Sequence, residues 1–145
     1  MTFLLDVNVL IALIDPAHVH HELSRGWFER EGRQSWATCP ICENGALRIV
    51  GHPAYGNSPG SPAAVAAVLL ELRTLGNHQF WPDDISLLAS ETVDPARLMV
   101  SGQVTDTYLL ALAVSKGGRL ATLDRRLIAS AVNGGESGLY LVGQA

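Results

Sequence analysis

Short runs rich in apolar residues alternate along this chain with longer segments in which apolar residues recur at helical spacing. Each short run has the length of one buried strand, and we expect strands at residues 3–5, 36–38, 79–81, 120–123 and 139–142. The longer segments predict helices over residues 7–14, 16–31, 40–50, 62–75 and 106–115. Strands that alternate with helices in this way predict an α/β fold with a parallel sheet covered by helices on both faces.

The second of these helices has a marked start in the sequence. Asp15 followed by Pro16 has the form of an N-cap residue with a proline in the first helical turn. Val19, Leu23 and Trp27 then recur every four residues, as apolar residues do on one face of a helix. We therefore expect a helix that begins at Asp15 and runs until the glycine at position 32.

Other segments are recognised by capping and turn residues. Thr105 can cap the helix at 106–115, whose nearly continuous apolar character predicts that it is buried. Residues 52–61 predict a loop because Pro, Gly, Asn and Ser recur throughout, whereas residues 85–90 predict a short helix. No repeat, low-complexity tract or linker divides the chain, so we expect a single domain over residues 1–145.

Composition narrows the class of protein. The chain has 145 residues, 48% of them hydrophobic, and a net charge of −4, which argues against a general nucleic-acid coat protein. The longest apolar stretch, residues 63–70, is far shorter than the about 20 residues that a membrane-spanning helix needs. The N-terminus has no basic region of a signal peptide, so we expect a cytoplasmic protein without membrane association.

Four acidic residues fall at positions where an α/β fold places its chemistry. Asp6 and Asp124 directly follow two of the strands, and Asp106 lies in the first turn of the buried helix. Glu43 shares a helix face with apolar residues, where a carboxylate is costly unless a cation lies beside it. Four converging carboxylates would repel one another, and a hard divalent cation such as Mg²⁺ or Mn²⁺ would neutralise them.

The same residues lie within motifs that resemble those of a known family. The motifs are LLDVNVLI at residues 4–11, CENGALR at 42–48, VTD at 104–106 with LALA at 110–113, and ATLD at 121–124. In this order and at this spacing they resemble the motifs of PIN-domain ribonucleases, and more closely those of VapC-type toxins of bacterial toxin–antitoxin pairs. The resemblance covers nearly the whole chain.

This resemblance implies a fold, an activity and a site. The expected fold is a three-layer α/β/α PIN-like domain with a central, mainly parallel sheet. The expected activity is hydrolysis of phosphodiester bonds in RNA by an endoribonuclease that depends on Mg²⁺, with Mn²⁺ as a substitute. A cognate antitoxin protein and a second copy of the chain are the implied partners. The catalytic, metal-binding positions are Asp6, Glu43, Asp106 and Asp124, and the supporting positions are Asn8 and Thr122.

Three other interpretations compete with this one. Cys39 and Cys42 form a C-x-x-C at a helix start, which would suit a dithiol oxidoreductase or half of a zinc site, although two buried small apolar residues explain the pair as well. A phosphohydrolase with Asp6 as nucleophile needs a second acid two residues later, where this chain has Asn8. A non-catalytic module that binds RNA or protein gains nothing from clustered negative charge near phosphate.

Overall fold

The predicted strands form one parallel sheet. A computed structural model of the chain describes residues 1–89 and 91–143. Its strands are β1 (Phe3–Leu5), β2 (Trp36–Thr38), β3 (His78–Phe80), β4 (Arg119–Thr122) and β5 (Leu139–Leu141). They lie in the order β3-β2-β1-β4-β5, and each neighbouring pair is parallel. The carboxyl ends of these strands therefore share one edge of the sheet, as the sequence predicted.

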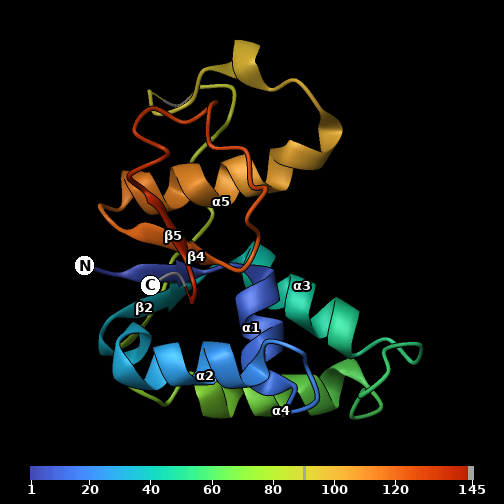
Figure 1. Cartoon of the computed structure of the whole chain (residues 1–145). Coiled ribbons are helices and arrows are strands. Elements are labelled where there is room, and N and C mark those ends of the chain that lie inside the picture. Colours follow the sequence, from blue (N-terminus) through green and yellow to red (C-terminus); the bar gives the residue numbers. More distant parts are fainter. Residues whose placement is uncertain (90, 144–145) are drawn as a thin grey trace.

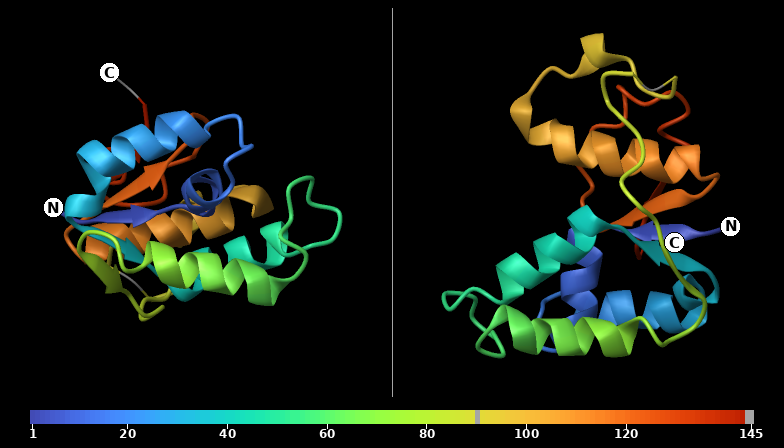
Figure 2. Two further views of the ribbon diagram at one scale, coloured as in Figure 1. Left: turned by 90° about the horizontal axis from the view of Figure 1, so that it is seen from below. Right: turned by 180° about the vertical axis from the view of Figure 1, so that it is seen from behind.

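Helices cover both faces of the sheet. The main helices are α1 (Val7–Ile14), α2 (His21–Arg30), α3 (Pro40–Val50), α4 (Pro62–Leu72) and α5 (Val104–Ser115). Helices α1 to α4 lie on one face and α5 lies on the other (Figure 1), and Figure 2 shows the same arrangement from below and from behind. The expected three-layer α/β/α fold is therefore confirmed. None of the described helices has the length and apolar character that a membrane span requires.

Burial in the core explains why β1 and residues 109–113 of α5 are apolar on all sides. Strand β1 lies between β2 and β4 with helices above and below, and its Leu4 and Leu5 are fully buried. Residues 109–113 of α5 are likewise fully buried, so no side of this part of the helix needs polar residues. Each fully buried leucine contributes about 1.5–3 kcal/mol. This packing fixes the two elements that carry Asp6 and Asp106.

The start of α2 differs from the prediction. Asp15 is the C-cap of α1, and its carboxylate accepts hydrogen bonds from the backbone N–H of Ala17, the Tyr55 hydroxyl and the Asn57 amide. These partners from the loop at 52–61 hold Asp15 outside α2, which begins only at His21. The interpretation of Asp15 and Pro16 as a helix start was therefore wrong, because a tertiary contact outweighs the local capping pattern.

The later start also changes the face that α2 buries. Val19 precedes the helix and is 86% exposed, while Leu23 is 42% exposed. Trp27 is buried, together with Phe28 on the next position. The expected stripe of Val19, Leu23 and Trp27 is thus wrong for its first two members.

The segment at residues 85–89 is irregular where a short helix was predicted, and residues 87–89 form a turn. Residues 85–89 contain no helix, and residue 90 lies outside the described residues. Ile85 and Leu87 both pack against the core while Ser86 and Leu88 are exposed. The backbone N–H of Ala89 donates to the carbonyl of Ser86, which closes a turn at this place. Two apolar residues can therefore reach the core here without a helix.

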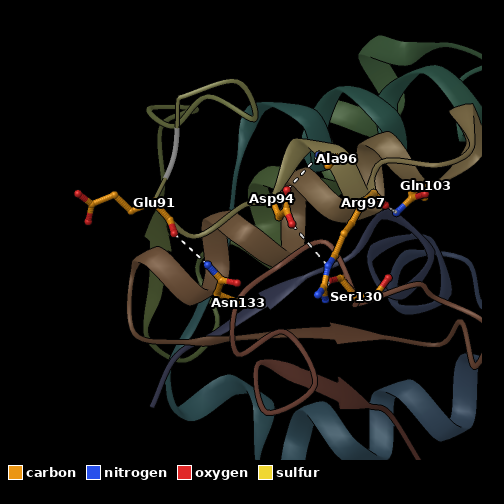
Figure 3. Close-up of polar contacts among 7 residues, drawn as sticks. All are labelled: Glu91, Asp94, Ala96, Arg97, Gln103, Ser130 and Asn133. Carbon is orange, nitrogen blue, oxygen red and sulfur yellow. Dashed lines mark hydrogen bonds and ion pairs between the residues drawn. The ribbon is translucent and has the colours of Figure 1, made fainter.

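Side-chain contacts hold the chain between residues 91 and 103 above α5 (Figure 3). The Asn133 amide donates to the carbonyl of Glu91 over 3.1 Å, and the Arg97 guanidinium donates to the carbonyl of Ser130 over 3.3 Å. The buried Gln103 donates to the carbonyl of Arg97 over 3.2 Å and forms the N-cap position of α5. Helix α5 thus starts one residue before Thr105, the predicted cap.

Candidate active site

Asp6 is fixed at the edge of the sheet by its position between β1 and α1. It is the N-cap of α1, and its Oδ1 accepts a hydrogen bond from the backbone N–H of Val7 over 2.7 Å. Its Oδ2 accepts a hydrogen bond from the Thr122 hydroxyl over 2.7 Å. Burial raises the pKa of Asp6, the two hydrogen bonds lower it, and the negative charge of Asp124 raises it further, so that the net shift is upward. Asp6 is therefore a buried acid whose charged form the hydrogen bonds support.

Asn8 and Thr122 join the start of α1 to the end of β4. The Asn8 amide donates to the Thr122 hydroxyl oxygen over 3.3 Å, and its Oδ1 accepts a hydrogen bond from the backbone N–H of Leu123 over 3.1 Å. The same Thr122 oxygen accepts a hydrogen bond from the backbone N–H of Asp124 over 3.1 Å. Thr122 thus contacts Asp6, Asn8 and the backbone of Asp124, and its one hydroxyl proton is donated to Asp6.

Asp106 approaches the same edge from α5, on the opposite face of the sheet. Its pKa is raised to about 6, first by burial and then by the negative charges of Asp6 and Asp124. Within residues 1–89 and 91–143, no hydrogen-bond donor contacts its carboxylate. Three of the four acids expected from the sequence are therefore within electrostatic reach of one another.

Glu43 lies in the first turn of α3 and has other partners. Its Oε2 accepts a hydrogen bond from the Thr38 hydroxyl over 2.6 Å and lies 3.3 Å from Nη1 of Arg73. Arg73 is thus the cation that a carboxylate on this helix face needs. The charges that raise the pKa of Asp6 and Asp106 come from the other aspartates. Glu43 therefore lies at the start of the helix that follows β2, at the same sheet edge, and its Oε2 is directed toward Thr38 and Arg73.

A histidine on β3 contacts Thr38, the hydrogen-bond donor to Glu43. The Nε2 of His78 lies 2.7 Å from the Thr38 hydroxyl oxygen. Because a carboxylate only accepts hydrogen bonds, the single proton of Thr38 goes to Glu43, and His78 must donate to Thr38. Burial, and then the positive charge of Arg73, lower the pKa of His78. Thr38, Arg73 and His78 were not predicted from the sequence, which has no local pattern that joins them to Glu43.

Comparison with known proteins identifies the family. Residues 3–132 match the model of the PIN domain. The chain belongs to the PIN-domain family. This PIN-domain protein is 43% identical over 134 residues to Ribonuclease VapC44 of Mycobacterium tuberculosis, a match that covers 92% of this chain and 94% of the relative. It is equally similar to Ribonuclease VapC39 of the same organism, with coverage of 92% and 96%. The family resemblance of the sequence motifs is therefore confirmed.

A solved structure supports the same PIN fold. A chain in the crystal structure of VapBC2 from Rickettsia felis bound to a promoter DNA fragment superimposes with a TM-score of 0.61. The alignment covers 97% of each chain at 11% sequence identity. At this identity the likeness concerns the arrangement of the helices and strands.

The chemistry of the PIN-domain acids suits a hard divalent cation. All four expected ligands are carboxylates, and the charges of Asp6 and Asp124 oppose ionisation of Asp106, an effect that a bound cation would reverse. In the part of the chain that the structure describes, no three His, Cys, Asp or Glu side chains converge closely enough to hold a metal ion. The carboxylate oxygens are therefore the right type of ligand for such a cation. The acidic side chains would have to move closer together to bind it.

Cys39 and Cys42 lie next to this edge but inside the core. Their sulfur atoms are 3.3 Å apart, both are free thiols, and neither is exposed to solvent. The contact with Cys42 lowers the pKa of Cys39, while the pKa of Cys42 is raised. An oxidoreductase must present a sulfur atom to its substrate. Their complete burial therefore favours the interpretation as two small apolar residues.

Proposed function

We propose that this PIN-domain protein is a metal-dependent endoribonuclease. In this proposal it acts in the cytoplasm as the toxin of a toxin–antitoxin pair, and residues 1–145 form one domain. The observation that supports this most directly is the set of three aspartates at the sheet edge, Asp6, Asp106 and Asp124. They occur in a chain that is 43% identical to relatives named Ribonuclease VapC. The substrate is RNA, and the bond that is broken is a phosphodiester.

In this proposal four carboxylates hold the cation. Asp6, Asp106 and Asp124 would bind Mg²⁺, or Mn²⁺ in its place, together with Glu43. The oxygen Oε1 of Glu43 is available for this, because Thr38 and Arg73 both contact Oε2. When bound, the metal supplies a water of lowered pKa and a positive charge next to the leaving oxygen.

The other residues set the positions of these carboxylates. Thr122 holds Oδ2 of Asp6, so that the carboxylate has a fixed orientation before substrate binds. Asn8 holds the backbone of Leu123, which precedes Asp124. Such preorganisation reduces the rearrangement that the site needs when RNA binds. Asn8 and Thr122 are thus positioning residues rather than ligands.

The proposed partners follow from the toxin assignment. A nuclease that cleaves the RNA of its own cell requires an inhibitor, and we propose that a cognate antitoxin protein binds this chain. We also propose that two copies of the chain associate as a homodimer. Co-purification with the product of the adjacent reading frame tests the first partner, and the mass in solution tests the second.

A cleavage assay tests the enzymatic proposal. The purified chain is mixed with single-stranded RNA in Mg²⁺, in Mn²⁺ and in EDTA, beside Asp106→Asn and the control Asp94→Asn. Asp94 is a half-buried acid whose side chain pairs with Arg97 in the segment before α5. We expect cleavage by the wild type and by Asp94→Asn in either metal, and loss of cleavage in EDTA and in Asp106→Asn. Cleavage that survives EDTA, or that Asp106→Asn retains in full, contradicts the proposal.

Thermal unfolding tests metal binding without reference to activity. A ligand that binds only the folded state stabilises it by about 2.7 kcal/mol at one hundred times its dissociation constant. We expect Mg²⁺ and Mn²⁺ to raise the melting temperature of the wild type, and Asp124→Asn to reduce this increase. Equal melting temperatures of the wild type with and without millimolar Mg²⁺ and Mn²⁺ would contradict a carboxylate metal site.

A further inference from the structure

An arginine and an exposed aromatic ring lie together next to Glu43. Arg73 follows the last turn of α4, and its guanidinium carbon lies 5.7 Å from the centre of the Phe80 ring. The Phe80 residue is 45% exposed, and the Arg73 side chain is 36% exposed. The Phe80 ring and the Arg73 guanidinium are therefore adjacent, and both are partly accessible to solvent.

The register of the sheet puts this pair on the edge that carries the acids. Phe80 is the last residue of β3 and pairs with Thr38, the last residue of β2. Strand β2 in turn lies beside β1, which is followed directly by Asp6. Neighbouring strands are about 4.8 Å apart, so β3 lies about 10 Å from β1. An RNA strand bound at the acids can reach Phe80 with a neighbouring nucleotide.

We propose that Arg73 and Phe80 form an RNA-binding subsite, in which one base stacks on the open part of the Phe80 ring and a phosphate contacts Arg73. This inference rests on the proposed nuclease function and specifies how the substrate is held. Aromatic side chains bind single-stranded nucleic acid by stacking, which tolerates any base. Stacking requires unpaired bases, so the subsite selects single strands over duplex RNA.

Electrostatics gives the reason for a cation at this place. The three aspartates repel a phosphate backbone, and the net charge of the chain is −4. A positive group close to the acids, in addition to the proposed metal ion, therefore favours binding of a strand. The ion pair with Glu43 uses Nη1 of Arg73, and a guanidinium has five N–H donors in all. Donors remain for a phosphate while the contact with Glu43 is kept.

Arg73 has a second role that the experiment must separate from RNA binding. Because it pairs with Glu43, its removal also affects the orientation of a proposed metal ligand. In the described part of the chain, the Phe80 side chain contacts Arg73 but no acid, so Phe80→Ala removes the ring and keeps both partners of the Arg73–Glu43 ion pair. Phe80→Trp keeps an aromatic surface and serves as the conservative replacement. Leu88→Ala and Arg97→Gln are matched controls, because both residues are exposed and lie in the segment before α5.

The affinity for RNA is measured with a fluorescent single-stranded oligoribonucleotide in Mg²⁺, with all variants made in an Asp106→Asn background to prevent turnover. We expect Phe80→Ala to weaken binding about tenfold, which is within the range for one stacked base. Phe80→Trp should bind as well as the parent or better. Arg73→Gln should weaken binding and reduce the slope of log K against log salt by about one. The two control variants should bind within twofold of the parent.

Steady-state kinetics in the active protein give a second measurement. For Phe80→Ala we expect KM to rise about tenfold with kcat within threefold, since the ring touches substrate rather than the metal site. Equal affinities of Phe80→Ala and Leu88→Ala overturn the subsite. The subsite is also overturned if Arg73→Gln lowers only kcat and Phe80→Ala has no effect. Arg73 would then act only by positioning Glu43.

The failure of this inference can be distinguished from failure of the proposed function. If the unsubstituted protein cleaves no RNA in Mg²⁺ or Mn²⁺, the nuclease proposal itself is wrong. If it cleaves RNA and the Phe80 variants bind single strands and duplexes like the parent, only the subsite is wrong. A defect of Phe80→Ala in binding the antitoxin, with normal RNA affinity, would assign the surface to a protein partner and also overturn the subsite.

Discussion

The Thr122 hydroxyl donates to Oδ2 of Asp6 over 2.7 Å and so joins two residues that are 116 positions apart in the sequence. Thr122 is fully buried, and its oxygen also accepts hydrogen bonds from Asn8 and from the backbone of Asp124. The hydroxyl thus has one donor and two acceptor roles, all of them in use. A single buried oxygen therefore sets the geometry between the start of α1 and the end of β4.

Thr122→Val tests this contact, because valine has the same shape without the hydroxyl. Asp6 loses a donor, and Asn8 and the Asp124 N–H lose their acceptor. We expect a loss of about 2 kcal/mol in the free energy of unfolding, and at least a tenfold loss of RNA cleavage. Urea unfolding and a cleavage assay at pH 7 measure the two effects.

Two further variants make this result specific. Thr122→Ser keeps the hydroxyl and should retain most of the stability and the activity. Thr2→Val removes a hydroxyl that contacts Ser35 at the opposite end of β1, so it should not change the cleavage rate. An equal loss of activity in Thr2→Val and Thr122→Val would show that stability alone, and not the Asp6 contact, controls cleavage.

The raised pKa of Asp106 predicts how stability depends on pH in EDTA. Its folded-state pKa of about 6 lies above the usual value of 3.8, so the folded protein binds more protons than the unfolded chain between these values. The free energy of unfolding therefore falls as the pH rises from about 4 to about 6. Asp106→Asn should be more stable than the wild type at pH 7, by about 1 kcal/mol after allowance for solvent screening. This advantage should vanish below pH 4.

Urea unfolding of both proteins in EDTA between pH 4 and pH 8 measures this dependence. Asp94→Asn is the matched control, since it removes a carboxylate that pairs with Arg97 and belongs to none of the three aspartates at the sheet edge. The same advantage of Asp106→Asn at all pH values would contradict the electrostatic origin of the effect. Asp6 has a pKa shifted in the same direction, so the Asp106→Asn variant should keep part of the pH dependence of the wild type.

The sequence was sufficient to place three of the acids at the sheet edge, because each lies in a recognisable local sequence pattern. Asp6 and Asp124 follow apolar strands and Asp106 opens a buried helix, and these patterns depend on nearby residues only. The sequence also showed that Glu43 needs a cation. It could not show that this cation is Arg73, because the contact depends on how the end of α4 packs beside α3, 30 residues further on.

The same distinction explains the two errors in the predicted fold. Asp15 has the local pattern of a helix start, yet Tyr55 and Asn57 bind its carboxylate from a distant loop. Residues 85–90 have apolar spacing that suits a helix or an irregular segment with a turn. Only the position of the core decides between them, and Ile85 and Leu87 reach it on alternate residues.

Thr38→Val tests whether the orientation of Glu43 affects the proposed metal site. The substitution removes the donor to Oε2 of Glu43 and the acceptor of His78, while the ion pair with Arg73 remains. We expect the Mg²⁺ concentration for half-maximal cleavage to rise about tenfold, because loss of an outer hydrogen bond to a ligand commonly weakens metal binding by 10- to 100-fold. Cleavage rates and melting temperatures measured across a Mg²⁺ titration give this value.

A merely structural effect of Thr38→Val would lower stability without changing the Mg²⁺ dependence. Thr38→Ser should restore the wild-type Mg²⁺ requirement, and Thr2→Val should leave it unchanged. An unchanged requirement in Thr38→Val would show that the hydroxyl does not position Glu43 for metal binding.

Cys39 and Cys42 lie beside the site without solvent exposure. Replacing both by alanine removes two small buried groups that touch no substrate, so we expect a loss of about 1–2 kcal/mol in the free energy of unfolding. The rate of RNA cleavage, measured where the variant is fully folded, should stay within threefold of the wild type. Alkylation of the native protein should be slow for the same reason, since the thiols are inaccessible until the chain opens. Cleavage that is lost on treatment with hydrogen peroxide and restored by a thiol, in the wild type and not in the double variant, would instead give the pair a redox function.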